Sequence, residues 1–375
     1  MPEKKAVCII TCHDVYNAGA SLQAYALMKH LRDEGHDARI IDYKPDYLSG
    51  HYSLTKVANP RYDLPLIRWA YLAAKLPGRL RYRRGNKKRE FDRFRKDFLV
   101  LTDRTYHSFE ELKKDPPIAD LYLAGSDQIW NPRFPNGHDP SFYLAFAGGS
   151  GKKASYAASF SVEALSRDEQ AEMKPYLMTL DKISVREKRA VDLVRGMGLD
   201  AVQVCDPVLL HDRAFWEGFE DSEKEAEEGP YCFVYDFDRS PEAETLIDLV
   251  RKDHPCRVIS YFPSSRADKV SDCGPAGFVS LIRKADFVIS SSFHATVFSL
   301  IFHKNFLVIP RKEDLNSRME DLLERTGLEE RFVRRPDQAE NPAEIDWERV
   351  DRVLEEERVF SRQFLAQMLS GAKEE

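Results

Sequence analysis

His294 stands where an expected strand meets an expected apolar helix, in the stretch "DFVISSSFHATVFSL" at residues 286–300. The start of a helix presents free backbone N–H groups and the positive end of the helix dipole, so it attracts anions. Ser291 and Ser292 can cap this helix or bond an anionic ligand, and His294 in the first turn can donate a hydrogen bond or a proton to that ligand. A serine-capped helix whose histidine bonds a backbone carbonyl is the structural alternative.

Arg186 offers a second way to hold an anion. It comes at the end of an expected strand in "ISVREKRA", residues 183–190. Its planar guanidinium group can grip a carboxylate or a phosphate through two parallel hydrogen bonds. An ion pair with Glu187, or with an acid of a neighbouring loop, is the alternative.

Two further loops carry polar residues that suit a sugar. In "NAGAS", residues 17–21, Gly19 lets the backbone approach a ligand closely, with Asn17 beside it. This loop has no GxGxxG spacing and no P-loop lysine, so its support for a nucleotide site is weak. The loop "GSDQIWN" sets an aromatic ring beside hydrogen-bonding groups, which suits a sugar face, although the same residues can simply close a turn. We assign to the acceptor side Asn17, Gly19, Asp127, Gln128, Trp130 and Asn131.

Apolar strands alternate with amphipathic helices in two runs, which predicts parallel sheets built from βαβ units. The fold class is therefore α/β, with two doubly wound, Rossmann-like domains facing a cleft. From about Lys44 to Pro117 the pattern predicts helices and no clear strand. The predicted divisions are an N-terminal α/β domain at 1–215, an acidic linker at 216–230, a C-terminal α/β domain at 231–340 and a helix at 341–375. In such folds ligands bind beyond the carboxyl ends of the strands, where all these loops fall.

Composition narrows the class of protein. The chain has 375 residues and a formal net charge of -6, which argues against nucleic-acid binding through bulk electrostatics. Six scattered cysteines without a CxxC pair predict a reducing compartment, and no signal peptide or membrane span is recognisable, so we expect a cytoplasmic protein. No cofactor is implied, and no metal site is expected, because His303 faces another side of the helix from His294 and no second ligand has zinc spacing.

The stretch "RLRYRRGNKKREFDRFRK", residues 79–96, carries ten basic and two acidic residues after an apolar and aromatic run. Such a segment can contact the anionic inner face of a membrane or hold a polyprenyl diphosphate. A solvated basic helix is the alternative.

Taken together, these stretches resemble the polysaccharide pyruvyl transferase family. They lie in the family's order over roughly residues 6 to 330, and the specific ones are "AGSDQIWNP", "SVREKRAVDLVRGMG" with "VCDPVLL", and "SSFHATVFSLIFHKNFLVI" with "NSRMEDLL". The resemblance implies a fold similar to GT-B glycosyltransferases and transfer of a pyruvyl unit from phosphoenolpyruvate to a sugar of a surface polysaccharide or its precursor, usually as a ketal. The sugar acceptor can be linked to a polyprenyl diphosphate.

The resemblance also suggests roles for particular residues. The donor-binding arginine carries over to Arg186, the family's histidine to His294, and a further cation to Arg318, for which Arg311 and Lys312 compete. We interpret His294 as an acid or as a stabiliser on the phosphate side. From its position we interpret Asp127 as a base near the acceptor.

Two rival functions remain. One is a GT-B glycosyltransferase that uses a sugar nucleotide, whose ribose-binding carboxylate would be Glu313 or Asp314. The other is a non-catalytic carbohydrate-binding protein with the same fold. Replacing His294 separates these classes, because a binder keeps its ligand whereas a transferase loses turnover.

Overall fold

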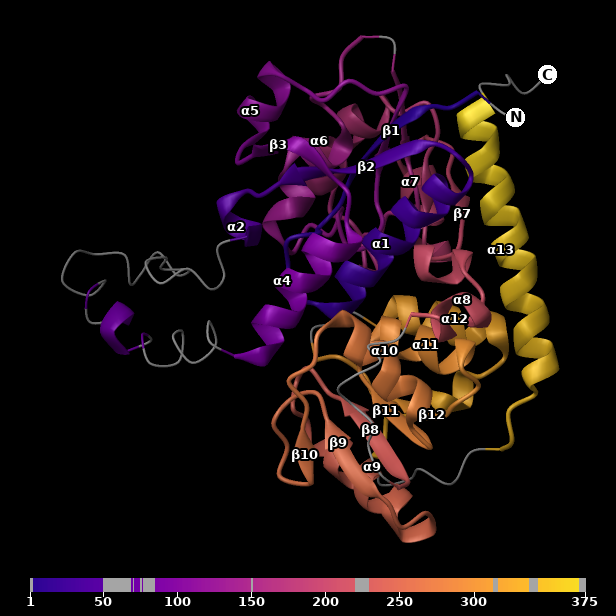
Figure 1. The fold of residues 1–375 in the computed structure, drawn as a ribbon. Helices are drawn as coiled ribbons and strands as arrows, with labels where there is room; N and C mark the ends of the chain where they lie inside the picture. Colours follow the sequence, from indigo (N-terminus) through magenta and orange to yellow (C-terminus); the bar gives the residue numbers. More distant parts are fainter. Residues whose placement is uncertain are drawn as a thin grey trace.

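Two parallel sheets form the framework of the protein (Figure 1). The computed structural model describes residues 3–49, 85–149, 151–219, 229–312, 316–336 and 343–370, with a few positions between 69 and 76. One five-stranded sheet comes from residues before 156, and the other comes from residues after 230. We call the parts built on these sheets the N-terminal unit and the C-terminal unit.

The N-terminal sheet has the strand order β3-β2-β1-β4-β5, all parallel. Its apolar strands are buried on both faces, as the continuous hydrophobic runs predict. The strands are β1 (Ala6–Ile10), β2 (Asp37–Tyr43), β3 (Leu101–Tyr106), β4 (Leu121–Ala124) and β5 (Lys152–Ser155). A short parallel pair continues the sheet beyond β5 through single bridges, and its strands are β6 (Ser184–Val185) and β7 (Val202–Gln203).

Helices connect these strands. The α-helices of the N-terminal unit are α1 (Ala18–Asp33), α2 (Asp46–Ser49), α4 (Asn86–Phe98), α5 (Phe109–Lys114), α6 (Arg167–Leu177), α7 (Lys188–Gly196) and α8 (Arg213–Glu217). Its 3-10 helices are η2 (Pro135–His138), η3 (Pro140–Tyr143) and η4 (Pro207–Leu210). Asn17 accepts a hydrogen bond from the Ala20 N–H and so caps α1.

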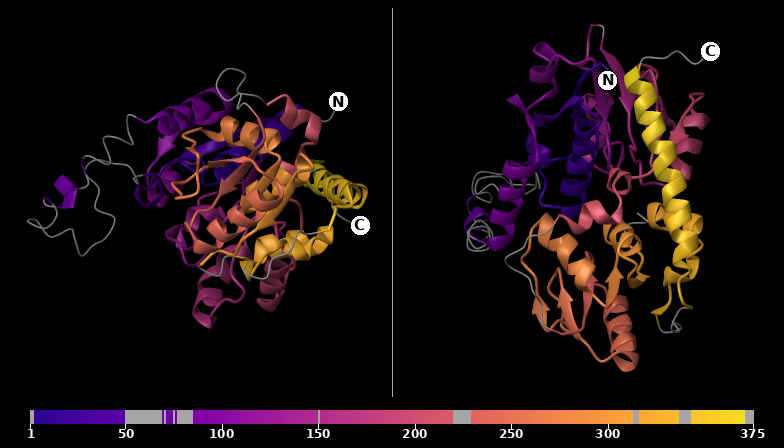
Figure 2. Two further views of the ribbon diagram at one scale, coloured as in Figure 1. Left: turned by 90° about the horizontal axis from the view of Figure 1, so that it is seen from below. Right: turned by 45° about the vertical axis from the view of Figure 1, so that its right-hand side comes forward.

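The C-terminal sheet repeats the plan with the order β10-β9-β8-β11-β12. Its strands are β8 (Tyr231–Tyr235), β9 (Arg257–Ser260), β10 (Lys269–Val270), β11 (Phe287–Ser290) and β12 (Asn305–Val308). Its helices are α9 (Pro241–Asp253), α10 (Pro275–Lys284), α11 (Phe293–Ile301), α12 (Ser317–Thr326) and the 3-10 helix η5 (Glu329–Arg331). Helices α10, α11 and α12 lie on the side facing the N-terminal unit, and α9 lies on the other side (Figures 1 and 2).

One hydrophobic cluster joins the two units. It runs from α1 through η4 and α8 to α10 and α11. Trp216 packs edge-on against Phe298, with ring centroids 5.0 Å apart, and its indole N–H donates to the Val208 carbonyl. Burying aromatic surface between the units stabilises their arrangement, because each ring removes a large apolar area from water.

Helix α13 (Trp347–Ser370) leaves the C-terminal unit and runs back along the N-terminal unit (Figures 1 and 2). The Ser361 hydroxyl accepts from the Cys205 N–H at 2.9 Å. Arg358 and Arg362 donate to the carbonyl oxygens of Leu209 and Leu210 in η4. The helix was predicted, but its return to the N-terminal unit was not.

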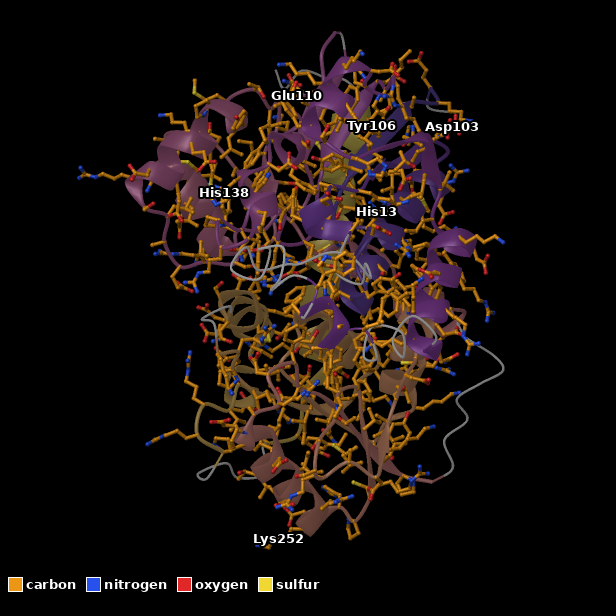
Figure 3. The ribbon with its side chains drawn as sticks, turned by 90° about the vertical axis from the view of Figure 1, so that its left-hand side faces the viewer. His13, Asp103, Tyr106, Glu110, His138 and Lys252 are labelled. Carbon is orange, nitrogen blue, oxygen red and sulfur yellow. The ribbon has the colours of Figure 1, made fainter. Side chains whose placement is uncertain are left out.

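The sequence predicted no clear strand between Lys44 and Pro117. This prediction is wrong, because β3 lies within that range. Asp103 and Arg104 in this strand are exposed, since β3 is at the edge of the sheet. An edge strand buries only part of its surface, so its sequence lacks the apolar run that marks β1 or β4. Figure 3 labels Asp103 and Tyr106 of β3, His13 just after β1, and Lys252 at the far end of the C-terminal unit.

The described part of the basic segment forms most of α4, which packs against α10 of the other unit. Phe91 and Phe94 are buried, and the Lys87 amine lies 3.5 Å from the ring centroid of Tyr261. Positions 79–84 lie outside the described residues, and membrane contact through this segment stays a prediction. Among the described helices, none is both long and apolar enough to cross a membrane.

Candidate active site

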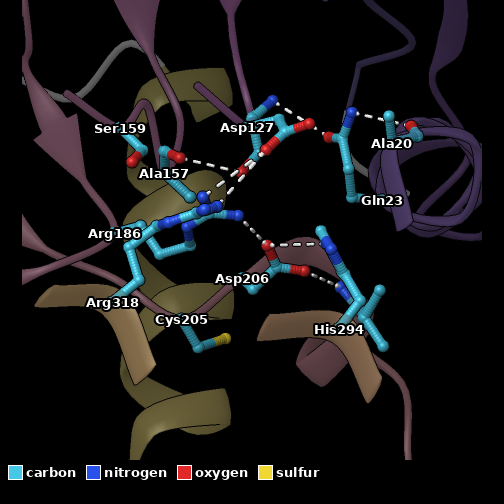
Figure 4. A network of polar contacts seen from close by, with 12 residues as sticks. Ala20, Gln23, Asp127, Ala157, Ser159, Arg186, Cys205, Asp206, His294 and Arg318 are labelled. Atoms are coloured by element: carbon cyan, nitrogen blue, oxygen red, sulfur yellow. Dashed lines mark hydrogen bonds and ion pairs between the residues drawn. The ribbon is translucent and has the colours of Figure 1, made fainter. Parts of the chain in front are cut away.

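Asp206 is the centre of a polar cluster buried between the two units (Figure 4). One of its oxygens accepts a hydrogen bond from Arg186 Nη1 at 2.7 Å and lies 3.5 Å from His294 Nε2. The other oxygen accepts from the Val208 N–H at 3.0 Å. Burial opposes ionisation, but His294 and Arg186 hold the pKa of Asp206 below its usual range. The carboxylate therefore links an arginine of the N-terminal unit to a histidine of the C-terminal unit.

Arg186 follows β6 and is only 2% exposed. Its backbone N–H donates to the Ala158 carbonyl, which fixes the strand end. Burial disfavours the charge, but Asp206, Asp127 and Glu187 outweigh it and raise the pKa of the guanidinium. Nε and Nη2 make no hydrogen bond among the described residues, although both are buried. Buried donors are normally paired, so two unfilled donors on one arginine mark a place for an acceptor.

Arg318 approaches the same place from the second residue of α12. The guanidinium carbons of Arg186 and Arg318 lie 4.5 and 5.8 Å from the ring centroid of Phe293, the first residue of α11. Both face one oxygen of Asp127, at 3.6 Å from Arg186 and 3.7 Å from Arg318. These distances are long for ion pairs, so Asp127 neutralises the two cations only in part.

Burial, together with the neighbouring Arg186, lowers the pKa of Arg318 to about 10. The Nε of Arg318 makes no hydrogen bond among the described residues. A second negative charge between the arginines would relieve the repulsion and fill these donors. The geometry is therefore suited to binding an anion.

His294 is held from both sides. Ser292 caps α11 by accepting from the Ala295 N–H at 3.4 Å, which places His294 in the first turn. On the other side lies Gly19 of α1, where an added Cβ would come within 2.1 Å of His294 Nδ1. The missing side chain of Gly19 therefore makes room for the imidazole ring, and its acceptor role stays a prediction.

Asp127 follows β4 in a loop braced by α1. Gln23 accepts from the Ser126 N–H at 3.2 Å and donates to the Thr11 hydroxyl at 2.9 Å. Asp127 itself has a φ of 74°, a conformation that aspartate tolerates better than most residues. This fixed backbone directs the Asp127 carboxylate toward the arginines (Figure 4).

The sugar-stacking role predicted for Trp130 is wrong, because the ring is fully buried. It stacks on Tyr143 with centroids 5.6 Å apart and donates its indole N–H to the Phe142 carbonyl. Asn131 is also buried, and its amide donates to the side chain of Gln128 at 2.9 Å. These three residues close the loop and contribute to the core.

Two other predicted ligand groups have structural partners. The Ser291 hydroxyl accepts from the Phe237 N–H at 3.0 Å and lies 3.4 Å from the Tyr235 carbonyl. Asn17 caps α1, as described above, and is exposed. The competitor Arg311 pairs with Asp238 at 2.9 Å, whereas Glu313 and Asp314 lie outside the described residues. Among the described residues, no group of three His, Cys, Asp or Glu side chains could hold a metal ion.

Sequence reasoning gave no role to Asp206. The signal was present in "VCDPVLL", where an aspartate follows a strand and precedes a proline. That pattern is typical of a capping residue, and Asp206 does cap η4. Its second function depends on Arg186 and His294, which lie far away in the sequence.

A family model described as "Polysaccharide pyruvyl transferase" matches residues 17–313, which include every residue of this cluster except Arg318. The chain belongs to this family. No curated protein matches the sequence. This family description supports a transferase in general.

Solved structures support the fold. The chain is similar to the Staphylococcus aureus structure described as "MnaA-UDP co-structure", with a TM-score of 0.51, 9% identity and coverage of 98% of this chain and 90% of that one. A putative UDP-N-acetylglucosamine 2-epimerase from Listeria monocytogenes gives a TM-score of 0.47 at 11% identity, covering 94% and 95%. Arabidopsis thaliana UGT89C1 gives 0.45 at 14%, covering 99% and 96%. The predicted α/β fold with two parallel sheets, similar to GT-B enzymes, is confirmed.

Proposed function

We propose that the protein transfers a pyruvyl group from phosphoenolpyruvate to two hydroxyls of a sugar, forming a ketal and releasing phosphate. One observation carries this proposal: Arg186 and Arg318 converge on Phe293 with buried donors that have no hydrogen-bond partner among the described residues. Phosphoenolpyruvate carries a carboxylate and a phosphate, and both are acceptors that a guanidinium fork binds well. Family membership supports the same chemistry.

The reaction needs protons to move in opposite directions. Two acceptor oxygens form bonds to C2 of the donor, C3 gains a proton to become a methyl group, and the C2–O bond to phosphate breaks. Of the two protons lost by the hydroxyls, one balances that gained by C3 and the other leaves with phosphate or solvent. Groups held in different protonation states can serve both needs.

His294 and Asp127 take these roles in our proposal. His294, oriented by Asp206 on one side and Gly19 on the other, donates a proton or stabilises the departing phosphate. Asp127 faces the two arginines of the donor site, and its carboxylate is the proposed acceptor of a proton from the sugar hydroxyl. Arg186 and Arg318 neutralise the charge that develops on the leaving phosphate.

A sugar-nucleotide glycosyltransferase is the second candidate. The observation that favours it is the fold similarity to the S. aureus structure, whose description includes UDP.

We also propose that the acceptor of the pyruvyl group is a precursor of a surface polysaccharide handled inside the cell, either lipid-linked or free.

Thermal unfolding tests the donor. A ligand at about 100 times its Kd stabilises the folded state by about 2.7 kcal/mol, which raises the midpoint by several degrees. We expect phosphoenolpyruvate to raise the midpoint of thermal unfolding by more than inorganic phosphate does. Arg318→Gln should abolish this rise, because one of the two donor grips is lost.

Arg331→Gln is the matched control. Arg331 is 1% exposed and lies in the same unit, but it donates to the Phe306 carbonyl and not to the cluster. Its variant should keep the phosphoenolpyruvate response. A rise only with a UDP-sugar would favour the glycosyltransferase, and equal rises with phosphate and phosphoenolpyruvate would contradict a specific donor site.

A further inference from the structure

The phenyl ring of Phe237 is half exposed at the edge of the C-terminal sheet where its parallel strands end. The order β9-β8-β11-β12 sets side by side the residues that follow these strands: Phe262, Phe237, Ser291 and Arg311. Ligands of doubly wound folds bind beyond this edge. A single exposed apolar side chain is ordinary, so the position of Phe237 needs support from its surroundings.

The surroundings hold the ring in place. The Phe237 N–H donates to the Ser291 hydroxyl at 3.0 Å, and Asp236 accepts from the Asp238 N–H at 3.1 Å. The Arg311 guanidinium lies 4.4 Å from the Phe237 ring centroid, and its Nε donates to Asp238 at 2.9 Å. Phe262 packs edge-on with centroids 5.5 Å apart. A ring fixed in this way loses little further freedom when it binds a ligand.

The same loops carry the donor site. Ser291 directly precedes Ser292, the cap of the helix that holds His294. The Arg311 N–H donates to Asn316 at 2.8 Å, and Asn316 is the cap residue of the helix that holds Arg318. The backbone that carries the exposed ring is therefore tied to the loops of the donor site, whereas the ring itself makes none of these bonds.

We propose that Phe237, with Arg311 and Phe262 beside it, is the platform that binds a pyranose ring of the sugar acceptor. The C–H face of a pyranose packs on an aromatic ring, and the guanidinium group can donate to its hydroxyls. The platform replaces Trp130 as the aromatic element of the acceptor site. The assignment of this platform to the acceptor rests on the proposed function. Its binding of carbohydrate can be tested without measuring turnover.

Lys87 extends the platform at its other end. Its amine lies 5.0 Å from the ring centroid of Phe262, and no carboxylate among the described residues lies within ion-pair distance of it. Arg311 is paired with Asp238, and Asp272 lies near Lys87, so these two side chains can donate hydrogen bonds to sugar hydroxyls and set no preference for a charged sugar.

Saturation-transfer NMR with methyl β-glucoside and methyl β-glucuronide tests the platform. Ring protons of both sugars should be saturated by the wild-type protein. Phe237→Ala should reduce the saturation about fivefold or more, since stacking on one ring dominates such contacts. Saturation of neither sugar by the wild type would overturn the proposal.

Phe360→Ala is the matched control, because Phe360 is also 49% exposed but lies on α13. It should leave the saturation unchanged. Equal losses in the two variants, or no loss with Phe237→Ala, would contradict the platform. The stabilisation by phosphoenolpyruvate should survive Phe237→Ala, so a failed donor test and a failed platform test can be told apart.

Discussion

The N-terminal unit contains a second buried cluster with almost the same chemistry as the candidate site, built on His13 and Asp42. His13 Nε2 lies 3.1 Å from Asp42, and the Lys44 amine lies 2.8 Å from the same carboxylate oxygen. Burial opposes the ionisation of Asp42 as it does that of Asp206, and in both clusters neighbouring donors hold the pKa of the aspartate below its usual range. Histidine, carboxylate and cation are present in both.

The difference lies in what is left unfilled. The second ring nitrogen of His13 contacts the Thr11 carbonyl at 3.4 Å, and the remaining oxygen of Asp42 accepts from Thr105 and Lys44. In the cluster around Asp206, by contrast, Arg186 and Arg318 keep buried nitrogens that make no hydrogen bond among the described residues, and His294 Nε2 approaches Asp206 only to 3.5 Å. Burial and a shifted pKa are common to both clusters, and a single unfilled donor is also found elsewhere, on the buried Nε of Arg331. What sets the Asp206 cluster apart is that two arginines with unfilled donors lie side by side there.

The largest expected effect separates the two histidines. His294→Ala should reduce turnover about 10³-fold, because it removes the residue that we propose as proton donor or phosphate stabiliser. It should lower the free energy of unfolding by less than His13→Ala does, since its contact with Asp206 is longer, at 3.5 Å, than the 3.1 Å contact of His13 with Asp42, although Asp206 loses one of the groups that keep it ionised. Phosphate release from phosphoenolpyruvate with a mixture of sugar acceptors measures the first effect, and urea unfolding measures the second.

His13→Ala is the counterpart. It should lower the free energy of unfolding by about 3 kcal/mol, because Asp42 loses a buried partner. The folded fraction should keep its turnover. A loss of turnover in folded His13→Ala protein would break the comparison.

A smaller effect is expected from Gly19→Ala. The new Cβ would meet the imidazole of His294, so either the ring or α1 must shift. We expect a stability loss of about 2 kcal/mol and a reduction of turnover of about 10-fold to 100-fold. Gly196→Ala is the control, because nothing lies within 4 Å of its added Cβ, and a glycine replaced in a helix should cost nothing. Equal behaviour of the two variants would show that Gly19 does not position His294.

The smallest expected effect is a loss of stability at acid pH. Asp42 and Asp206 both have a pKa lower in the folded protein than in the unfolded chain, so each contributes stability that is present above the unfolded value and lost as pH falls below it. Between about pH 5 and about pH 3, each should account for a loss of about 1 kcal/mol. In urea unfolding measured at several pH values, Asp42→Asn and Asp206→Asn should each make the free energy of unfolding fall less steeply as the pH is lowered. An unchanged slope in either variant would show that its carboxylate is not held ionised by its partners.

The sequence predicted the fold where apolar patterning is strong and failed where it is weak. The buried strands β1, β4, β8 and β11 stand out as continuous apolar runs. The edge strand β3 has no such run. Trp130 was misplaced because an aromatic ring among polar residues gives the same pattern whether it faces solvent or, as here, stacks on Tyr143 inside the loop.

Arg186, His294 and Arg318 could be selected because each stands at a strand end or a helix start, and parallel sheets bring such positions together. The sequence could not predict how many hydrogen bonds each of these three side chains makes in the folded protein. The role of Asp206 depends on the packing of one unit against the other, and Gly19 acts through a side chain that it lacks. Neither property is local in sequence.

Helix α13 has a consequence for how the chain folds as it is synthesised. Its Ser361, Arg358 and Arg362 bond Cys205, Leu209 and Leu210, across sequence separations of 156, 149 and 152 residues. The turn that carries Asp206 therefore gains these partners only after the whole C-terminal unit has left the ribosome. Contacts this distant also form slowly, because the loop they close is long. A nascent N-terminal unit would thus hold this turn without the hydrogen bonds that α13 supplies.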